Sequence, residues 1–250
     1  MRIVSLCPSL TELVFDLDAG HELVGITDYC IHPKLGVEHV EKVGGTKDPR
    51  VDRIVELAPD LVLLNQEENR EQDAVALEGA GLHCLTTFPK TIPDTADMVR
   101  VIADAIGRQE AGEVIAVDIE QRGERVRRES EALPPVRFAY LIWRKPWMTV
   151  NADTFTNALL QAAGGENVFG GHEMRFPAVK VEELAATAPQ VVLLSSEPFP
   201  FAEKHIKELA ARTGLPEGSF RLVDGELLSW HGSRTPRGID YAEQLLTNIR

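Results

Sequence analysis

Apolar and polar positions follow one pattern that the chain contains twice. Val51 to Glu67 reads VDRIVELAPDLVLLNQE and Val181 to Glu197 reads VEELAATAPQVVLLSSE, with seven identical positions at a constant offset of 130 residues. In each copy a short helix ends at Ala-Pro, because a residue before proline is disfavoured in helical geometry. The apolar run that follows does not alternate, which predicts a strand covered on both faces. An offset of about half the chain is far from the roughly 20–50 residues of a solenoid repeat, so we predict two similar lobes.

Strand-like and helix-like segments alternate over the rest of the chain. Before residue 109 the predicted elements are Arg2–Leu6, a helix from Ser9 to Gly20, Glu22–Ile26, the repeated unit, Asn69–Ala80, His83–Thr87 and Pro93–Ile106. After residue 133 they are Val136–Trp143, Thr154–Ala163, the repeated unit, Phe201–Arg212, Phe220–Val223 and Pro236–Ile249. Ser9 and Glu12 have the spacing of a capping box, so we expect Ser9 to cap the first helix. The alternation predicts an α/β fold with parallel sheets that helices cover on both faces.

The segment Gln109–Leu133 is strongly charged and has a sparse apolar stripe and no proline. It predicts one long helix that connects the lobes, and an ordinary surface helix of one lobe is the alternative. We therefore predict two Rossmann-like lobes, residues 1–108 and 134–250, joined by a connector helix over residues 109–133.

Composition and charge exclude several partners. The 250 residues are 44% hydrophobic and 26% charged, as in an ordinary globular protein. A net charge of −13 argues against nucleic acid or an anionic membrane, which need clustered Lys and Arg. It fits a neutral or cationic ligand or a basic protein surface, and solubility alone is the alternative explanation. No apolar run reaches the roughly 20 residues that a membrane-embedded helix requires.

The cysteines and the first residues of the chain bear on the cellular compartment in which the protein is expected. Cys7, Cys30 and Cys84 are an odd number without a close pair, which indicates neither a disulfide framework nor a zinc knot. The chain opens MRIVSLCPS, without the features of a signal peptide. As written it is expected to be cytoplasmic. The alternative is a periplasmic or extracellular protein whose leader has been removed.

Candidate site residues follow from the sheet, because ligands of open parallel sheets bind beyond the carboxyl ends of the strands. Residues near these ends are Tyr29, Cys30, His32, Glu67, Trp143, Arg144, Trp147, Glu197, Trp230, His231 and Arg234. The tryptophans and Tyr29 offer stacking surface for a planar ligand, and Arg144 and Arg234 would meet anionic groups. For each tryptophan the alternative is packing inside its own lobe.

His32 and His231 are the candidate metal ligands, with Cys30, Glu67 or Tyr29 completing a coordination shell. No two candidates have a local zinc-like spacing, so a satisfied loop histidine is the alternative for each. Cys7 lies between a strand and a helix, where backbone donors could stabilise a thiolate, but no base is evident. The sequence holds no GxSxG, GxxxxGK[ST], HExxH or GxGxxG motif in the right context. We therefore predict no catalytic residues and no enzymatic activity.

Four stretches resemble a known family over nearly the whole chain. They are SLCPSLTELVFDLDAGHELVGITDYCIHP near the N-terminus, the APDLVLL segment of the repeated unit, GGENVF at Gly164–Phe169 and SWHGSRTPR near the C-terminus. They resemble the class III periplasmic binding proteins of ABC importers, the helical-backbone metal receptors, and among these the cobalamin-binding proteins. The resemblance implies two Rossmann-like lobes joined by one long helix. It also implies a corrinoid, haem or metal siderophore in the cleft between the lobes.

The resemblance also assigns roles to single positions. Tyr29 matches a cleft tyrosine, Trp230 an aromatic residue near the ligand, and Thr235-Pro236-Arg237 the Ser-Pro-Arg that opens the last helix. Glu71 and Glu203 match the acidic residues, one in each lobe, that the family presents to permease arginines. The alternative is that both are carboxylates that favour helix starts. The loops at residues 30–32 and 143–147 lie outside the family pattern, so the ligand class stays open.

Three functions remain in view. The first is non-enzymatic binding of a corrinoid or another metal chelate, with no intrinsic cofactor and with an ABC permease as partner. The second is a cytosolic enzyme or metallochaperone that acts on the same cofactors and depends on His32 and His231. The third is a binding domain now used for protein interactions.

Overall fold

The computed structural model describes all 250 residues, which divide into two compact units. Unit 1 comprises Met1–Pro89, Pro93–Glu120 and His231–Arg234, and unit 2 comprises Lys90–Ile92, Gln121–Trp230 and Thr235–Arg250. This division differs from the predicted boundaries in three ways. The long helix is shared between the units, residues 90–92 belong to unit 2, and residues 231–234 near the C-terminus belong to unit 1.

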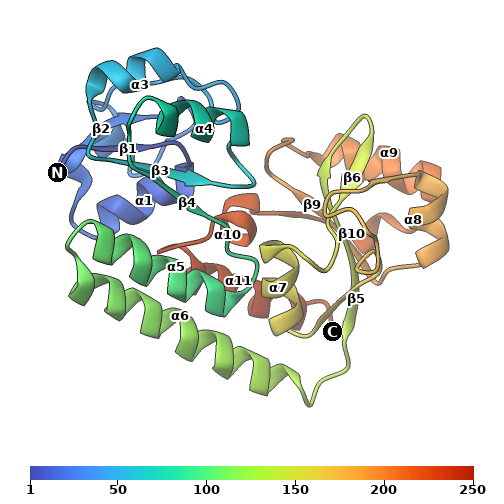
Figure 1. The fold of residues 1–250 in the computed structure, drawn as a ribbon. Coiled ribbons are helices and arrows are strands. Elements are labelled where there is room, and N and C mark those ends of the chain that lie inside the picture. The colour runs from blue at the N-terminus through green and yellow to red at the C-terminus, as the bar shows by residue number, and fades with distance from the viewer. The chain divides into compact units, whose positions relative to one another are not determined.

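Unit 1 is built on a four-stranded parallel sheet in the order β2-β1-β3-β4. In chain order the elements are β1 (Ile3–Ser5), α1 (Pro8–Asp16), a 3-10 turn (Gly20–Glu22), β2 (Leu23–Ile26), α2 (Lys34–Val37), α3 (Val51–Leu57), β3 (Leu61–Asn65), α4 (Glu71–Gly79), β4 (Cys84–Thr87) and α5 (Ile92–Ala105) (Figure 1). Ile3 pairs with Leu23 on one side and with Leu61 on the other, so β1 lies inside the sheet. The parallel α/β architecture predicted for this lobe is confirmed.

Unit 2 repeats that frame and adds to it. Its elements are β5 (Val136–Trp143), β6 (Trp147–Thr149), α7 (Phe155–Ala162), β7 (Gly165–Asn167), β8 (Ala178–Val179), α8 (Val181–Thr187), β9 (Val191–Ser195), α9 (Glu203–Thr213), a 3-10 turn (Glu217–Ser219), β10 (Phe220–Val223), α10 (Gly225–Ser229) and α11 (Thr235–Thr247). The parallel pairs β7-β5, β5-β9 and β9-β10 reproduce the order of unit 1. β6 and β8 extend the sheet from β5 as antiparallel strands, which the sequence did not predict.

The repeated unit folds alike in both copies. α3 and α8 end at Ala58 and Ala188, whose backbones are left-handed, with φ of 45° and 43°. β3 and β9 follow, and all five residues of each are buried. Arg2 donates hydrogen bonds to the carbonyl of Leu57, the last residue of α3. Arg137 donates to the carbonyls of Thr187 and Ala188 at the end of α8. Both arginines lie outside the repeated segments, so the repeat did not predict these contacts. The two similar lobes are therefore confirmed.

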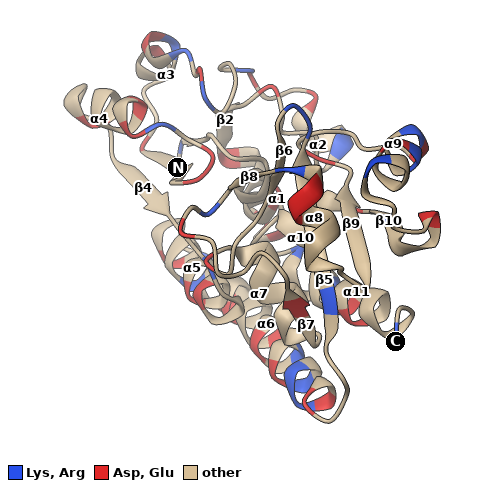
Figure 2. Cartoon of the chain, turned by 90° about the vertical axis from the view of Figure 1, so that its right-hand side faces the viewer, with Lys and Arg blue, Asp and Glu red and all other residues tan.

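α6 (Gln109–Ser130) is one continuous helix, with its first half in unit 1 and its second half in unit 2. Gly112 and Gly123 weaken helix propensity, but each allows a close approach by a neighbouring segment. A Cβ at Gly112 would lie 2.2 Å from Cβ of Ala103, and one at Gly123 would lie 2.8 Å from Ile92. Figure 2 shows acidic and basic residues mixed along the helix. None of the helices combines the length and apolar character of a membrane span.

The start of α1 differs from the prediction. Cys7 is the N-cap, no side chain caps the helix, and Pro8 occupies the first turn. Proline suits this position because it has no N–H to leave unsatisfied. Ser9 therefore lies inside the helix, with its hydroxyl 3.3 Å from Sγ of Cys7. The predicted capping box of Ser9 and Glu12 is wrong, because proline fixes the helix start upstream of Ser9.

Candidate ligand-binding site

The end of β3 is organised by the fully buried side chain of Asn65. Its Oδ1 accepts hydrogen bonds from the backbone N–H groups of Glu67 (2.9 Å) and Glu68 (3.3 Å). Its Nδ2 lies 3.2 Å from Nε2 of His231. Because two donors occupy Oδ1, the amide nitrogen faces the ring, so Nε2 accepts and the imidazole is neutral. Burial accordingly lowers the pKa of His231 to about 4.

Tyr29 lies in the loop after β2 and is 61% exposed. Beside it a short hairpin is closed by a bridge between Gly44 and Pro49. A Cβ at Gly45 would lie 3.4 Å from the Tyr29 ring and 2.2 Å from Oδ1 of Asp48. The missing side chain at Gly45 therefore makes room for the ring and the carboxylate together. Tyr29 keeps an open aromatic surface at the strand ends of unit 1.

Two carboxylates follow β3. Lys47, at the tip of the Gly44–Pro49 hairpin, donates a hydrogen bond to the backbone carbonyl of Glu67. Burial raises the pKa of Glu68 above its ordinary value, and the positive charge of Lys47 acts in the opposite direction. Only Glu67 was among the predicted residues, although Glu68 lies at the same strand end.

Two thiols of unit 1, those of Cys7 and Cys30, are buried. Cys30 is 1% exposed, with Sγ 3.1 Å from each of the hydroxyls of Thr11 and Thr27. Burial raises the pKa of both Cys30 and Cys7, that of Cys7 to about 12. Neither is a thiolate near neutral pH, so Cys7 lacks the activation that a nucleophile needs. The contacts of Cys30 support the loop from beneath, and we leave it out of the proposed ligand contacts.

Arg234, a predicted anchor for anionic groups, is committed to an ion pair. Its Nε and Nη2 each donate to a carboxylate oxygen of Glu12 at 2.7 Å. The two side chains are only 7% and 14% exposed. A ligand carboxylate could recruit this guanidinium only by competing with a bidentate partner already in place.

The predicted metal ligands do not form a shared site within unit 1. His231 directs Nε2 toward the Asn65 amide, and His32 lies half-buried in the loop after Tyr29. Nowhere in the chain do three or more His, Cys, Asp or Glu side chains gather as a metal site would require. The arrangement offers no preformed coordination shell for His32 or His231.

An aromatic cluster lies at the carboxyl end of the sheet in unit 2. Trp143 is 40% exposed and meets Phe199 edge to face at 5.9 Å between centroids. Phe199 contacts Phe201 at 4.8 Å, and Phe201 stacks on Trp147 at 6.1 Å. Trp147 is 8% exposed, so it packs in its own unit, whereas Trp143 keeps an open ring. Both phenylalanines follow β9 within six residues, so a longer window at that strand end would have found them.

Arg144 is held beside this cluster. Its guanidinium carbon lies 5.6 Å from the Trp147 ring centroid, and its nitrogens contact both carboxylate oxygens of Glu208 at 2.9–3.1 Å. The pair is 23% and 29% exposed and holds the pKa of Glu208 below its ordinary value, the hydrogen bond from Arg144 being the largest cause. Like Arg234, this predicted anchor is neutralised within its own unit.

Glu197, which follows β9, is fixed by neutral donors. Its Oε1 accepts from Nε1 of Trp230 at 2.7 Å and from the hydroxyl of Ser229 at 2.9 Å. Trp230 is 8% exposed. The indole therefore holds the strand-end carboxylate in place, which is a positioning contact that the sequence could not reveal.

Glu71 and Glu203, the predicted docking residues, occupy equivalent places. Each is the first residue of the helix that follows a copy of the repeated strand, α4 after β3 and α9 after β9. Both are exposed, and neither carboxylate makes a hydrogen bond or ion pair with the protein. The alignment by sequence was approximate for Glu203, and the structure gives both acids the same position in their helices.

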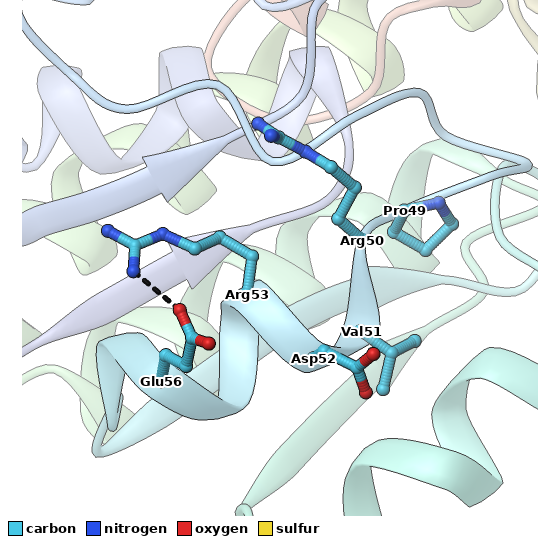
Figure 3. Close-up of a pocket in the computed structure, with 6 residues that line it drawn as sticks. All are labelled: Pro49, Arg50, Val51, Asp52, Arg53 and Glu56. Atoms are coloured by element: carbon cyan, nitrogen blue, oxygen red, sulfur yellow. Dashed lines mark hydrogen bonds and ion pairs between the residues drawn. The ribbon is translucent and has the colours of Figure 1, made fainter.

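A separate depression lies at the start of α3 and is drawn in Figure 3. It is lined by Pro49, Arg50, Val51, Asp52, Arg53 and Glu56. Arg53 is paired with Glu56 at 2.7 Å and with Glu41 at 2.6 Å, and Arg50 donates to the carbonyl of Lys42. Both guanidinium groups are thus engaged, and the depression contains none of the predicted site residues.

Comparisons with known proteins agree with the fold and the motifs. Residues 3–215 match the family model described as periplasmic binding protein. The vitamin B12-binding protein of Vibrio cholerae serotype O1 is 24% identical over 249 residues, which cover 100% of this chain and 89% of that protein.

Two solved structures share the fold over almost their full length. The periplasmic vitamin B12-binding protein of Vibrio cholerae superposes with a TM-score of 0.85 at 22% identity, covering 99% of this chain and 97% of that one. The periplasmic heme-binding protein of Roseiflexus sp. RS-1 gives a TM-score of 0.84 at 22% identity, with the same coverage. The prediction of a binding protein rather than an enzyme is confirmed by the family match. The chain belongs to the periplasmic binding protein family.

Proposed function

We propose that the protein binds a corrinoid, haem or a related metal chelate and delivers it to an ABC permease. The observation that carries this proposal is the extent of the likeness, which runs over the whole chain to proteins named for vitamin B12 binding and over the whole fold to heme-binding proteins as well. The exposed rings of Tyr29 and Trp143 support it, because flat chelates need aromatic contact surface. Glu67 and Glu197 belong to the proposed site as the matched strand-end acids.

Titration of the purified protein tests this function. Cyanocobalamin, hemin and a ferric siderophore are added separately while intrinsic tryptophan fluorescence and ligand absorbance are followed. We expect saturable quenching by at least one of them, and a Trp143→Ala variant should lose part of the signal and affinity. Trp147→Phe is the matched control, because Trp147 packs in its own unit. Absence of saturable binding by all three ligands contradicts the proposal.

We further propose a periplasmic location in place of the expected cytoplasmic one, since the family is one of periplasmic proteins. The free cysteines do not oppose this, because Cys7 and Cys30 are buried, Cys84 is half-buried, and burial raises the pKa of all three thiols. Thiols that are shielded and not ionised resist oxidation, because the thiolate is the reactive form. Fractionation of the native host into periplasm and cytoplasm, followed by immunoblotting, tests the location.

Glu71 and Glu203 are proposed as the permease-docking residues. Two unengaged acids at matching helix starts suit a partner with two basic patches. A Glu71→Gln, Glu203→Gln double variant should bind ligand as the parent does and support transport poorly in reconstituted vesicles with the cognate permease. Glu110→Gln with Glu217→Gln removes the same charge from other exposed positions and serves as the control. Unchanged transport by the docking variant contradicts the assignment.

The metallochaperone alternative receives no support from the geometry, because His32 and His231 share no coordination shell. A variant with both histidines replaced by alanine should retain whatever metal chelate the parent binds. Loss of bound metal with retention of the fold would favour that alternative.

A further inference from the structure

Tyr29 lies in a tight turn that is closed by three kinds of contact. The N–H of Cys30 donates to the carbonyl of Thr27 at 3.1 Å, which makes a β-turn with Asp28 and Tyr29 at its two central positions. The Thr27 hydroxyl and Sγ of Cys30 also lie 3.1 Å apart. Nζ of Lys42 donates to the carbonyl oxygen of Thr27 at 3.3 Å and to that of Cys30 at 2.9 Å. Backbone, side-chain and ammonium contacts therefore hold the same two residues together.

Lys42 is a half-buried cation that makes no ion pair. Its ammonium group donates to the two turn carbonyls, and none of the 39 Asp and Glu residues of the chain pairs with it. A hydrogen bond from a charged donor is stronger than one from a neutral donor. Lys42 thus stabilises the backbone around Tyr29, whereas a surface ion pair in its place would contribute little.

The backbone of Lys42 is itself fixed to the edge of the sheet. Lys42 forms a parallel bridge with Ile26, the last residue of the edge strand β2. Two residues further along each segment, the N–H of Asp28 donates to the Gly44 carbonyl at 2.9 Å. The segment that carries Lys42 therefore runs beside the turn as a continuation of the sheet. Through Lys42, the sheet edge determines where the turn and Tyr29 lie.

The ring on this turn is 61% exposed, so the protein itself covers little of it. An exposed aromatic residue in a loose loop loses conformational freedom when a ligand orders it, and that loss weakens binding. A ring on a closed turn avoids most of this cost, because its backbone is already ordered in the free protein. Binding residues on loops gain their precision from such support by the scaffold.

We propose that Lys42 is a positioning residue for ligand binding, which acts through Tyr29 by holding the turn in the conformation that binding requires. The inference rests on the proposed function, in which Tyr29 contacts the ligand, and adds a residue that acts beneath the contact surface. Two effects are expected when the ammonium group is removed. The turn opens more often, and the part of the affinity that depends on Tyr29 is lost.

Amide hydrogen exchange of the ligand-free protein, followed by NMR, measures the first effect. The amides of Asp28 and Cys30 report on the turn, since both donate to backbone carbonyls there. In Lys42→Met we expect both to exchange roughly 10-fold faster than in the parent. Lys42→Arg keeps a charged donor and should restore part of the protection. Lys34→Met removes the same charge from an exposed position on α2 and should leave both amides at the parent rate.

A double-mutant cycle with Tyr29→Ala measures the second effect. Cyanocobalamin is the probe, and hemin or the ferric siderophore takes its place if cyanocobalamin does not bind the parent. Lys42→Met should weaken binding roughly 10-fold when Tyr29 is present and less than about 2-fold when it is alanine. A residue that only stabilised the fold would not show this dependence on Tyr29. If Lys42→Met does not fold, Lys42→Gln, whose side chain is one bond shorter, gives the same reading.

Equal weakening of binding with and without the Tyr29 ring overturns the inference, because Lys42 would then act independently of Tyr29. That result leaves the proposed function standing. Exchange of the Asp28 and Cys30 amides at the parent rate in Lys42→Met also overturns the inference. If cyanocobalamin, hemin and the ferric siderophore all fail to bind the parent, the proposed function fails and this inference fails with it.

Discussion

β3 of unit 1 and β9 of unit 2 have the same backbone arrangement, but the side chains at their carboxyl ends differ. In unit 1 the fifth residue of the strand is Asn65, whose side chain receives two backbone N–H groups and faces His231. In unit 2 the same position is Ser195, whose hydroxyl accepts from the phenol of Tyr140 at 2.9 Å and donates to the carbonyl of Glu197 at 2.5 Å. The duplicated frame thus determines where polar groups meet at the strand end. The residue type at the matching position, Asn65 or Ser195, determines which groups they are.

The difference extends to what lies around each strand end. Unit 1 surrounds it with acids and one exposed tyrosine, whereas unit 2 surrounds it with an aromatic cluster and an arginine pair. Beneath the surface, unit 1 uses His231, whose pKa burial lowers to about 4, and unit 2 uses Tyr140, whose pKa burial raises. At acidic pH, protonation of His231 should destabilise unit 1, and His205, whose pKa burial also lowers, is the corresponding group in unit 2.

The largest expected effect compares the two arginine pairs. Arg234→Met leaves Glu12 buried without its cation, and we expect a loss of about 3–5 kcal/mol in the free energy of unfolding. Arg144→Met removes a more exposed pair and should cost only about 1 kcal/mol. Urea denaturation followed by circular dichroism measures both. Adding Glu12→Gln to Arg234→Met should recover much of the loss. An equal loss of unfolding free energy in the two variants would contradict the expectation that the more buried pair contributes more to stability.

The second effect is the pH dependence of unit 1. His231 has a folded pKa of about 4, below its unfolded value near 6.5, so the unfolded chain takes up the proton first as pH falls. Its contribution is complete above pH 6.5 and declines toward pH 4, by about 2 kcal/mol between pH 7.5 and 5. His231→Gln keeps an acceptor for Asn65 without titrating, so this part of the pH dependence should disappear. His39→Gln, at an exposed position, should keep the parent profile.

Much of the frame could be predicted because it depends on local patterns. The uninterrupted apolar runs of β3 and β9, the Ala-Pro helix ends and the charged stretch of α6 all concern neighbouring residues. β6 and β8 were not predicted, because strands of three and two residues are too short to show an alternation of apolar and polar positions. Their existence depends on pairing with β5, which is a tertiary contact.

The candidate site was predictable as a set of positions and not as a set of contacts. Strand ends gave Tyr29 and Trp143, which the structure leaves exposed. The partners that occupy the other polar residues lie far away in sequence, 222 residues for Arg234 with Glu12 and 166 residues for His231 with Asn65. A single sequence carries no signal for such pairings, so the same residues read equally well as ligand anchors or as internal contacts.

A smaller effect concerns the buried hydrogen bond between Tyr140 and Ser195 in unit 2. Tyr140 is 1% exposed, and Tyr140→Phe removes the hydrogen bond to Ser195 while the ring keeps its packing. We expect a loss of about 1 kcal/mol in unfolding free energy. The loss should be the same at pH 7.5 and pH 5, since neither residue titrates in that range. A loss that grows toward pH 5 would contradict the contrast drawn between Tyr140 and His231.

The smallest effect probes the feature that the units share most closely. Ala58 and Ala188 are exposed and have φ of 45° and 43°, a conformation that costs a residue with a Cβ about 1–2 kcal/mol. Glycine removes that strain and adds about 0.5–1 kcal/mol of chain entropy to lose on folding. Ala58→Gly and Ala188→Gly should therefore each raise the free energy of unfolding by about 0.5 kcal/mol. Ala80→Gly, at φ −82°, relieves no strain and should lower it. Arg2 and Arg137 cap the two helix ends alike. If one glycine variant raised the free energy of unfolding and the other lowered it, the same backbone conformation would have different energetic consequences in the two units.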